Sequence, residues 1–122
     1  MLVKDFITKE IPVLKSFDTG DYALTLMDDY KLKHLPVVSD DSFYYKGIIS
    51  EKELLSYSDL SVNIGNIYLA ESPSVRLETH LLEVLALITR NKLSLLPVIS
   101  DRDIYEGVVT REHLVDVCAD FC

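Results

Sequence analysis

The sequence predicts an α+β fold built from two β-α-β-β-α repeats. The chain has 122 residues, of which 48% are hydrophobic and 26% are charged, which is typical of a folded soluble protein. When the sequence is compared with itself, residues 61 positions apart match along much of the chain. Both copies also show the same order of helical and β-branched patterns, so each copy supports the interpretation of the other.

The strongest match within the repeat is a block of six residues. LPVVSD at residues 35–40 aligns with LPVISD at residues 96–101. The polar loop after this block is one residue shorter in the second copy, and loops of this kind tolerate insertions and deletions. The repeat therefore predicts two units, residues 1–60 and residues 61–122.

The first half of each copy is predicted to form a strand and a helix. Short extended segments are expected at Ile11–Leu14 and Ser74–Leu77. Apolar residues then recur at helical spacing over Ala23–Tyr30 and Leu81–Ile88, which predicts an amphipathic helix in each copy.

The second half of each copy is predicted to form a hairpin and a second helix. Short β-branched runs at residues 36–38 and 97–99 lead through a polar loop into runs at residues 45–49 and 105–109. Such runs favour strands, and a polar loop between two of them predicts a hairpin. The glycine in each second run is expected to let other backbone approach closely. After each second run, a helix with two adjacent apolar residues is expected.

Polar side chains that precede the helical patterns are the expected helix N-caps. These residues are Asp18 or Thr19, Ser50, Thr79 and Thr110. The helices of one copy would cover only one face of a small sheet and leave an apolar face exposed. The two copies are therefore expected to bury these faces together, with the polar stretch at residues 56–61 as the linker.

The charge balance argues against polyanionic partners. The chain carries 12 Lys and Arg against 20 Asp and Glu, a net charge of −8 at pH 7. An acidic surface repels nucleic acid and anionic membranes. No apolar run reaches the length of a spanning helix, and the first residues lack the apolar region of a secretion signal. We expect a cytoplasmic location, with no nucleic-acid partner and no membrane partner.

Residues that carry metal or catalytic chemistry do not form motifs. Cys118 and Cys122 are too close together for a stabilising disulfide and are expected to be reduced. The three histidines have no zinc-ligand spacing with these cysteines. The chain has no glycine-rich phosphate loop and no nucleophile beside a base. We therefore expect no metal site, no enzymatic activity and no required cofactor.

The duplicated Leu-Pro-Val-(Val/Ile)-Ser-Asp block is followed in each copy by Gly-hydrophobic-hydrophobic-(Ser/Thr) and a helix. This arrangement resembles a tandem pair of cystathionine beta-synthase (CBS) domains, also called a Bateman module, over residues 3–117. The resemblance implies that the repeats pack sheet to sheet about a pseudo-twofold axis. It also implies a non-catalytic regulatory module that commonly forms a homodimer.

The resemblance further implies that clefts between the copies bind AMP, ADP, ATP or S-adenosylmethionine and thereby control a partner. The expected partner is an effector protein in trans or a region outside this sequence, because the copies occupy nearly the whole chain. The alternative is a dimerisation or interaction scaffold with degenerate, non-binding clefts. The aromatic loop Phe43–Tyr45 fits either a loop folded over the core or a partner surface.

By the same resemblance, three groups of residues line the clefts. They are the lead-in segments at residues 8–12 and 69–73, the residues around each Leu-Pro pair, and the hydroxyl and helix start after each hairpin. The expected binding residues are Lys9, Ile11, Pro12, His34, Leu35, Pro36, Ser50, Glu53, Ser72, Pro73, Leu95, Pro97, Thr110, Arg111 and His113.

Two of these positions depart from the family pattern, in which an aspartate stands three residues after the hydroxyl. Glu53 is expected either to accept ribose hydroxyls or to form a capping box with Ser50. His113 cannot accept two hydroxyls as a carboxylate does, but it stands with Arg111 at a helix start that favours anions. Solvated side chains are the alternative there. The charges predict one acidic cleft, at Glu51 and Glu53, and one basic cleft.

Overall fold

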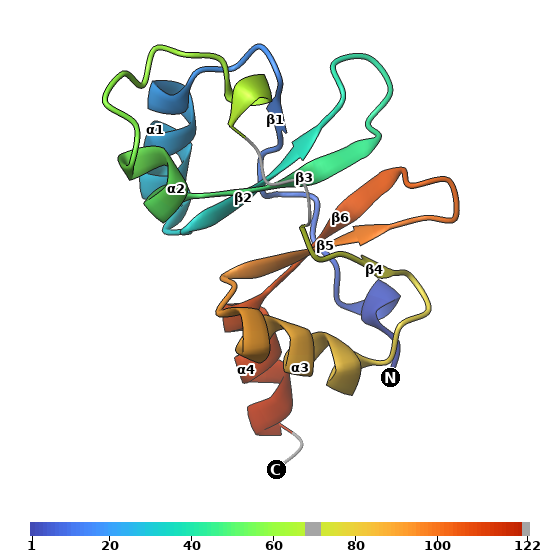
Figure 1. Ribbon diagram of the computed structural model, residues 1–122. Helices are drawn as coiled ribbons and strands as arrows, with labels where there is room; N and C mark the ends of the chain where they lie inside the picture. The colour runs from blue at the N-terminus through green and yellow to red at the C-terminus, as the bar shows by residue number, and fades with distance from the viewer. Residues whose placement is uncertain (68–71, 121–122) are drawn as a thin grey trace.

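The computed structural model describes residues 1–67 and 72–120, which form two lobes, one for each repeat (Figure 1). In each lobe the two helices lie on the side of the sheet that faces away from the other lobe. The first lobe contains β1 (Leu14–Lys15), α1 (Gly20–Tyr30), β2 (His34–Val38), β3 (Tyr45–Ser50) and α2 (Glu51–Leu55). The second contains β4 (Val75–Arg76), α3 (Leu81–Asn91), β5 (Leu95–Ile99), β6 (Tyr105–Thr110) and α4 (Arg111–Asp120).

Some residues with predicted roles lie outside the described ranges. The lead-in segment at residues 69–73 is described only from Ser72 onwards, and Cys122 and the Cys118 side chain are not described. The expectation of reduced thiols is therefore untested. Within the described ranges, no helix has both the length and the apolar character needed to cross a bilayer.

The two three-stranded sheets have the same topology. β1 pairs in parallel with β2, and β2 pairs antiparallel with β3; β4, β5 and β6 repeat this order. Both hairpins have a register shift at the matching position. The α+β prediction is confirmed. The first strand of each sheet is shorter than expected, because pairing with the central strand begins only at Leu14 and Val75.

Most of the expected helix caps are present. The side-chain oxygens of Thr19, Ser50 and Thr110 each accept a hydrogen bond from the backbone N–H three residues later. The expectation for Thr79 is wrong, because α3 begins one residue later. Its cap is His80, whose Nδ1 accepts a hydrogen bond from the Leu82 N–H at 3.1 Å.

The lead-in segments are exchanged between the repeats. The N-terminal segment, with the 3-10 helix η1 (Val3–Asp5), lies on the second lobe, where the Val3 N–H donates to the Thr79 carbonyl at 2.8 Å. The segment after α2, with η2 (Ile64–Asn66), lies on the first lobe, where the Ile64 N–H donates to the Asp18 carbonyl at 2.8 Å. In Figure 1 the blue N-terminal segment accordingly lies beside β4 and α3.

Each hydrophobic core combines side chains from both repeats. Val3 is fully buried in the core of the second lobe, and Ile64 is fully buried in the core of the first. Leu95 and Val108 also belong to the first core, and Ile48 belongs to the second. A division of the chain at residue 60 therefore separates the repeats in sequence but cuts through both cores.

The N-terminal segment reaches the second sheet at Gly107. Thr8 exchanges two backbone hydrogen bonds with Val108, at 2.8 and 3.0 Å. A Cβ added to Gly107 would lie 2.8 Å from the Thr8 carbonyl oxygen, and the φ of Gly107 is +146°. The close backbone approach that was expected at this glycine is confirmed.

The hairpin loops pair with each other across the lobes. The Tyr45 N–H donates to the Asp103 carbonyl and the Tyr105 N–H donates to the Phe43 carbonyl, both at 2.9 Å. Phe43 and Asp103 occupy matching positions and both have a left-handed backbone, with φ of 57° and 61°. Within the aromatic loop, Tyr45 is half-buried and packs against the second core, whereas Phe43 and Tyr44 are exposed; a partner surface at these two residues stays a prediction.

His34 and Ser94 form a polar contact between the lobes. The Ser94 N–H donates to His34 Nδ1 at 3.2 Å, and the Ser94 Oγ lies 2.9 Å from the same nitrogen. The Lys33 N–H donates to the Ser94 Oγ at 3.3 Å. Because Nδ1 is an acceptor here, the neutral ring carries its proton on Nε2. Burial, and secondarily the charge of Lys33, lowers the pKa of His34.

Replacing Ile64 with alanine should destabilise both lobes together. Removal of such a buried side chain costs about 2–5 kcal/mol, and the cores are shared. We expect amide signals from the two lobes to disappear in one urea transition with a lowered midpoint, measured by NMR. Val3→Ala, the matching change in the other core, should give the same single transition with a smaller loss. Separate midpoints for the two lobes would contradict the shared cores.

Stability should decrease in mild acid because of His34. The unfolded imidazole takes up a proton near pH 6.5, whereas the lowered pKa keeps the folded ring neutral. The unfolded chain thus binds more protons below pH 6.5, so the free energy of unfolding falls as the pH drops from there towards the lowered pKa.

His34→Asn tests this dependence, because the Asn oxygen can accept from Ser94 but does not titrate. Urea unfolding between pH 7.5 and 5 should show a steeper loss in the wild type than in the variant. Parallel curves for the two proteins would assign the acid sensitivity to other groups.

Candidate functional site

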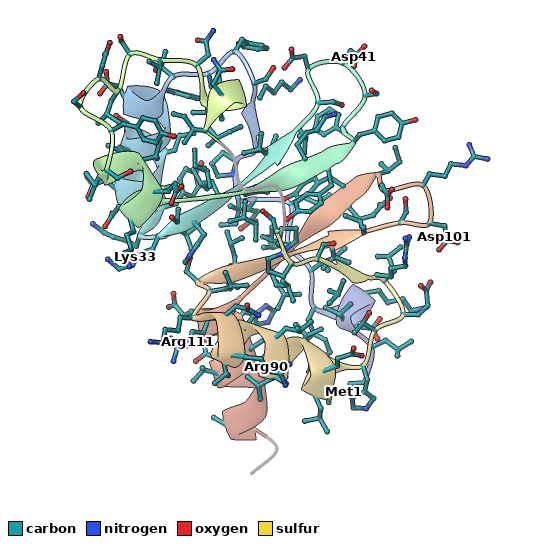
Figure 2. All side chains as sticks on the ribbon, viewed as in Figure 1. Met1, Lys33, Asp41, Arg90, Asp101 and Arg111 are labelled. Carbon is teal, nitrogen blue, oxygen red and sulfur yellow. The ribbon has the colours of Figure 1, made fainter. Side chains whose placement is uncertain are left out.

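Two open cavities lie next to each other where the lobes meet. Cleft A has a volume of about 730 Å³ and cleft B a volume of about 590 Å³. Figure 2 shows Lys33 and Arg111, which line cleft A, on the side of the molecule opposite to the hairpin loops that carry Asp41 and Asp101. Both clefts are lined by Lys33, His34 and Lys92.

Cleft A is built from both repeats. Its walls come from the N-terminal lead-in segment, the end of α1, the loops that precede β2 and β5, and the first turns of α4. The lining residues are Thr8, Glu10, Ile11, Tyr30, Lys31, Leu32, Lys33, His34, Lys92, Leu93, Ser94, Thr110, Arg111, Glu112, His113, Val115 and Asp116.

Matching backbone contacts position the helix starts beside the clefts. The Arg111 N–H donates to the Ser94 carbonyl at 2.9 Å, and the Glu51 N–H donates to the Lys33 carbonyl at the same distance. In both repeats this bond ties the first residue of the second helix to the loop before the central strand. The side chain of Arg111 is thereby presented at the edge of cleft A.

Lys31 and Lys92 end their helices in an unusual backbone conformation. Their φ values are 57° and 54°, in the left-handed region where glycine is the usual residue. The two residues occupy matching positions in the repeats. Lys31 lines cleft A, and Lys92 lines both clefts. A backbone held in this region by a residue other than glycine is common at functional sites.

The clefts concentrate positive charge in an acidic protein. Of the 12 cationic side chains in the sequence, five line clefts A and B, against four of the 20 acidic ones. Lys33 pairs with Glu51 at 3.5 Å. Within residues 1–67 and 72–120, no salt bridge joins Lys31, Lys92 or Arg111 to an acidic side chain. These three cations are therefore available to an anionic ligand.

Cleft B does not have the acidic character expected of the first copy. Glu51 is its single acidic lining residue, whereas Lys33, Lys52 and Lys92 also line it. Glu53 lines neither cleft. The prediction was wrong because two of these lysines come from loops outside the helix that carries the two glutamates.

The two departures from the family pattern have different surroundings. The Glu53 N–H donates to the Ser50 Oγ at 3.0 Å, which is one half of the expected capping box. The His113 ring lines cleft A and packs edge-on against Phe6, with the ring centroids 6.2 Å apart. His113 therefore contacts the exchanged lead-in segment and is not fully solvated.

Six of the fifteen expected site residues line the clefts. Cleft A is lined by Ile11, His34, Thr110, Arg111 and His113. Cleft B is lined by Ser50 and again by His34. Neither cleft is lined by Lys9, Pro12, Leu35, Pro36, Glu53, Ser72, Pro73, Leu95 or Pro97.

For most of the expected residues that line neither cleft, the structure shows the reason. The four strand residues Leu35, Pro36, Leu95 and Pro97 are buried inside the lobes. Ser72 and Pro73 bind the edge of the first sheet instead: the Ile48 N–H donates to Ser72 Oγ at 2.9 Å, and the Tyr45 hydroxyl donates to the Pro73 carbonyl at 3.1 Å. Lys9 is exposed outside both clefts.

Several lining residues were missed, among them Lys31, Lys33, Lys92, Ser94 and Asp116. The alignment of the repeats contained one signal for them, because a lysine stands at the matching positions 31 and 92. Among the residues described, no three His, Cys, Asp or Glu side chains gather closely enough to hold a metal ion.

Comparison with known proteins agrees with this architecture. The family model for the CBS domain matches twice, at residues 3–59 and 64–120. A CBS domain pair/ACT domain protein from Thermotoga maritima superposes with a TM-score of 0.87 at 21% identity, over 99% of this chain and 98% of that one. The CBS-pair protein CBSX2 from Arabidopsis thaliana superposes with a TM-score of 0.83 at 25% identity, over 98% of this chain and 95% of that one.

A curated relative is longer than this chain. Inosine-5'-monophosphate dehydrogenase from Methanocaldococcus jannaschii is 23% identical over 111 residues. The match covers 91% of this chain, which spans only 22% of that enzyme. Because the CBS family model matches both repeats and nearly the whole sequence, this protein belongs to the CBS domain family and is a tandem CBS pair.

Proposed function

We propose that this CBS pair is a non-catalytic regulatory module that binds an adenine nucleotide or another adenosyl compound in cleft A. The observation that carries the proposal is the group of three cations, Lys31, Lys92 and Arg111, which form no salt bridge within the described residues and line a cleft formed by both repeats. A crystal structure of CBSX2 in complex with AMP, 25% identical to this chain with a TM-score of 0.84, supports the choice of ligand.

The lining of cleft A suits each part of such a ligand. Arg111 and Lys92 supply positive charge for phosphate, and the positive end of the dipole of the ten-residue helix α4 lies beside them. Ile11 and Val115 offer apolar surface to a base. The carboxylate of Asp116 is an acceptor for hydroxyl groups.

The proposed output passes through the contact between the repeats. Cleft A draws its walls from both lobes, so a ligand there favours one relative arrangement of the lobes. An effector protein in trans, or a region outside this sequence, would read that arrangement.

Adenosyl ligands should raise the melting temperature of the wild-type chain. A ligand that binds only the folded state stabilises it by about 2.7 kcal/mol at a hundred times its dissociation constant. AMP, ADP, ATP and S-adenosylmethionine are compared by scanning calorimetry at millimolar concentration. At least one of them should shift the midpoint upwards.

Arg111→Gln should then weaken binding of the active ligand by about tenfold or more, because a charge-assisted contact is lost. Glu53→Gln is the matched control, since Glu53 lines neither cleft, and its affinity should equal that of the wild type. If no compound shifts the midpoint while the chain forms a stable dimer, the interaction scaffold becomes the better interpretation.

We also propose that two copies form a homodimer through their helices. Leu55 on α2 and Val115 on α4 occupy matching positions and are 62% and 53% exposed. Tyr22 on α1 and Leu82 on α3 are exposed as well. Leu55 and Val115 also line clefts B and A, so the proposed interface lies at the edge of the clefts.

Light scattering should report twice the chain mass for the wild type. The double variant Leu55→Glu, Val115→Glu should give the monomer mass, because charges would be buried at the helical interface. Phe17→Glu is the control, because Phe17 is 60% exposed but lies outside the helices. A monomeric wild type would contradict the homodimer.

A further inference from the structure

A half-buried histidine joins the two repeats at the base of their central strands. His34 is the first residue of β2, and Ser94 directly precedes β5. The Ser94 N–H donates to His34 Nδ1 at 3.2 Å, and the Ser94 Oγ lies 2.9 Å from the same nitrogen. This contact between the lobes therefore requires a free lone pair on Nδ1.

The same lone pair is the one that binds a proton. The neutral ring already carries a hydrogen on Nε2, so Nδ1 is the nitrogen that accepts the next one. Once Nδ1 is protonated, the Ser94 N–H faces a donor instead of an acceptor. The Ser94 Oγ can accept from the new N–H, so the ring keeps a partner while the backbone amide of Ser94 loses its own. Protonation of His34 and the backbone contact exclude each other.

The backbone of Ser94 is bonded to the start of α4. Its carbonyl accepts from the N–H of Arg111, the first residue of α4, at 2.9 Å, and Arg111 lines cleft A. In the first repeat, the Lys33 carbonyl accepts from the N–H of Glu51, the first residue of α2, at 2.9 Å. His34 thus stands in the middle of a series of bonds that joins α2 to α4. A displacement of Ser94 is transmitted to Arg111.

The repeats carry this titratable contact on one side only. Leu95 occupies the position in the second repeat that matches His34, and its side chain is fully buried. Lys33 occupies the position in the first repeat that matches Ser94. One proton therefore acts on the contact between the lobes, and no matching group across the pseudo-twofold axis offsets it.

The cations around His34 oppose its protonation. Burial of the ring, and secondarily the charge of Lys33, lowers the pKa of His34 below 6.5. The contact is therefore made at neutral pH and is lost as the pH falls through the lowered pKa. The cations that line the clefts with His34 come from the ends of α1 and α3 and the starts of β2, α2 and α4; they are Lys31, Lys33, Lys52, Lys92 and Arg111.

The acidic groups of the clefts favour the protonated ring. They come from the lead-in segment, α2 and α4, and are Glu10, Glu51, Glu112 and Asp116. Cleft A is also lined by the Tyr30 hydroxyl and by His113, a second imidazole. An experiment on His34 must therefore separate its titration from that of His113.

We propose that His34 is a pH-sensitive switch between the two lobes. At neutral pH the ring accepts from the Ser94 N–H and holds the start of α4 in place. In mild acid the protonated ring releases that N–H, Ser94 moves away, and Arg111 shifts at cleft A. The switch needs no ligand, so its failure and the failure of nucleotide binding are separate outcomes.

Amide hydrogen exchange of the full chain, followed by NMR between pH 7.5 and pH 5, tests the switch. The protection factor of the Ser94 N–H should fall by about tenfold or more, with the same midpoint as the titration of the His34 ring. The chemical shift of the Arg111 amide should follow that midpoint. The Tyr45 N–H is the internal control, because it bonds across the lobes to the Asp103 carbonyl and should keep its protection.

Two substitutions separate the acceptor from the charge. His34→Asn keeps an acceptor oxygen that does not titrate, so the protection of the Ser94 N–H should change by less than about twofold over the same pH range. His34→Leu removes the acceptor and introduces the residue that stands at the matching position of the second repeat. Its Ser94 N–H should lack protection at every pH. Both variants retain His113.

Loss of protection at Ser94 in the wild type but not in His34→Asn supports the switch. A Ser94 N–H that stays protected while His34 titrates overturns it, as does a wild-type level of protection in His34→Leu at pH 7.5. An equal loss in His34→Asn assigns the change to His113 or another group. Simultaneous loss at Tyr45 shows unfolding of the whole chain, which also contradicts a local switch. Should His34→Leu fail to fold, the comparison of the wild type with His34→Asn decides.

Discussion

The reciprocal burial of the lead-in segments is the constraint on which the rest of the structure depends. Val3 completes the core of the second lobe and Ile64 completes that of the first. Neither lobe keeps a full core when the other unfolds, so the two hold one relative arrangement. Clefts A and B take their walls from both lobes, and their shape follows from that arrangement. The pairing of Thr8 with Val108 holds the lead-in segment at cleft A, where both Thr8 and Ile11 line the cavity.

The repeats, the order of elements and most helix caps could be predicted because they depend on residues close together in sequence. The exchange of lead-in segments could not, since an apolar residue such as Val3 gives the same pattern whichever lobe it packs against. The site was predicted least well. Leu35 and Leu95 are neighbours of cleft residues in the sequence, but their side chains are buried in the cores. Lys31 and Lys92 line a cleft, and their left-handed backbone conformation could not be predicted from the residues around them.

The pseudo-twofold symmetry holds for the backbone but not for the side chains at the centre. The bonds from Arg111 to Ser94 and from Glu51 to Lys33 are matching contacts of equal length. The Tyr45 hydroxyl, in contrast, donates to Pro73, whereas the buried hydroxyl of its counterpart Tyr105 has no partner among the described residues. The clefts are asymmetric as well: cleft A, the larger of the two, lies at the start of α4, and the two clefts have different lining residues.

The pairing of Thr8 with Val108 also sets the order in which the chain is assembled during synthesis. The first lobe has all its strands and its borrowed segment once residue 67 has left the ribosome. Thr8 must remain unpaired until β6 has been made, because its partner Val108 lies about 100 residues later. The earliest part of the chain to be synthesised is thus among the last to reach its place, and a ribosome-bound fragment that lacks β6 has no complete cleft A.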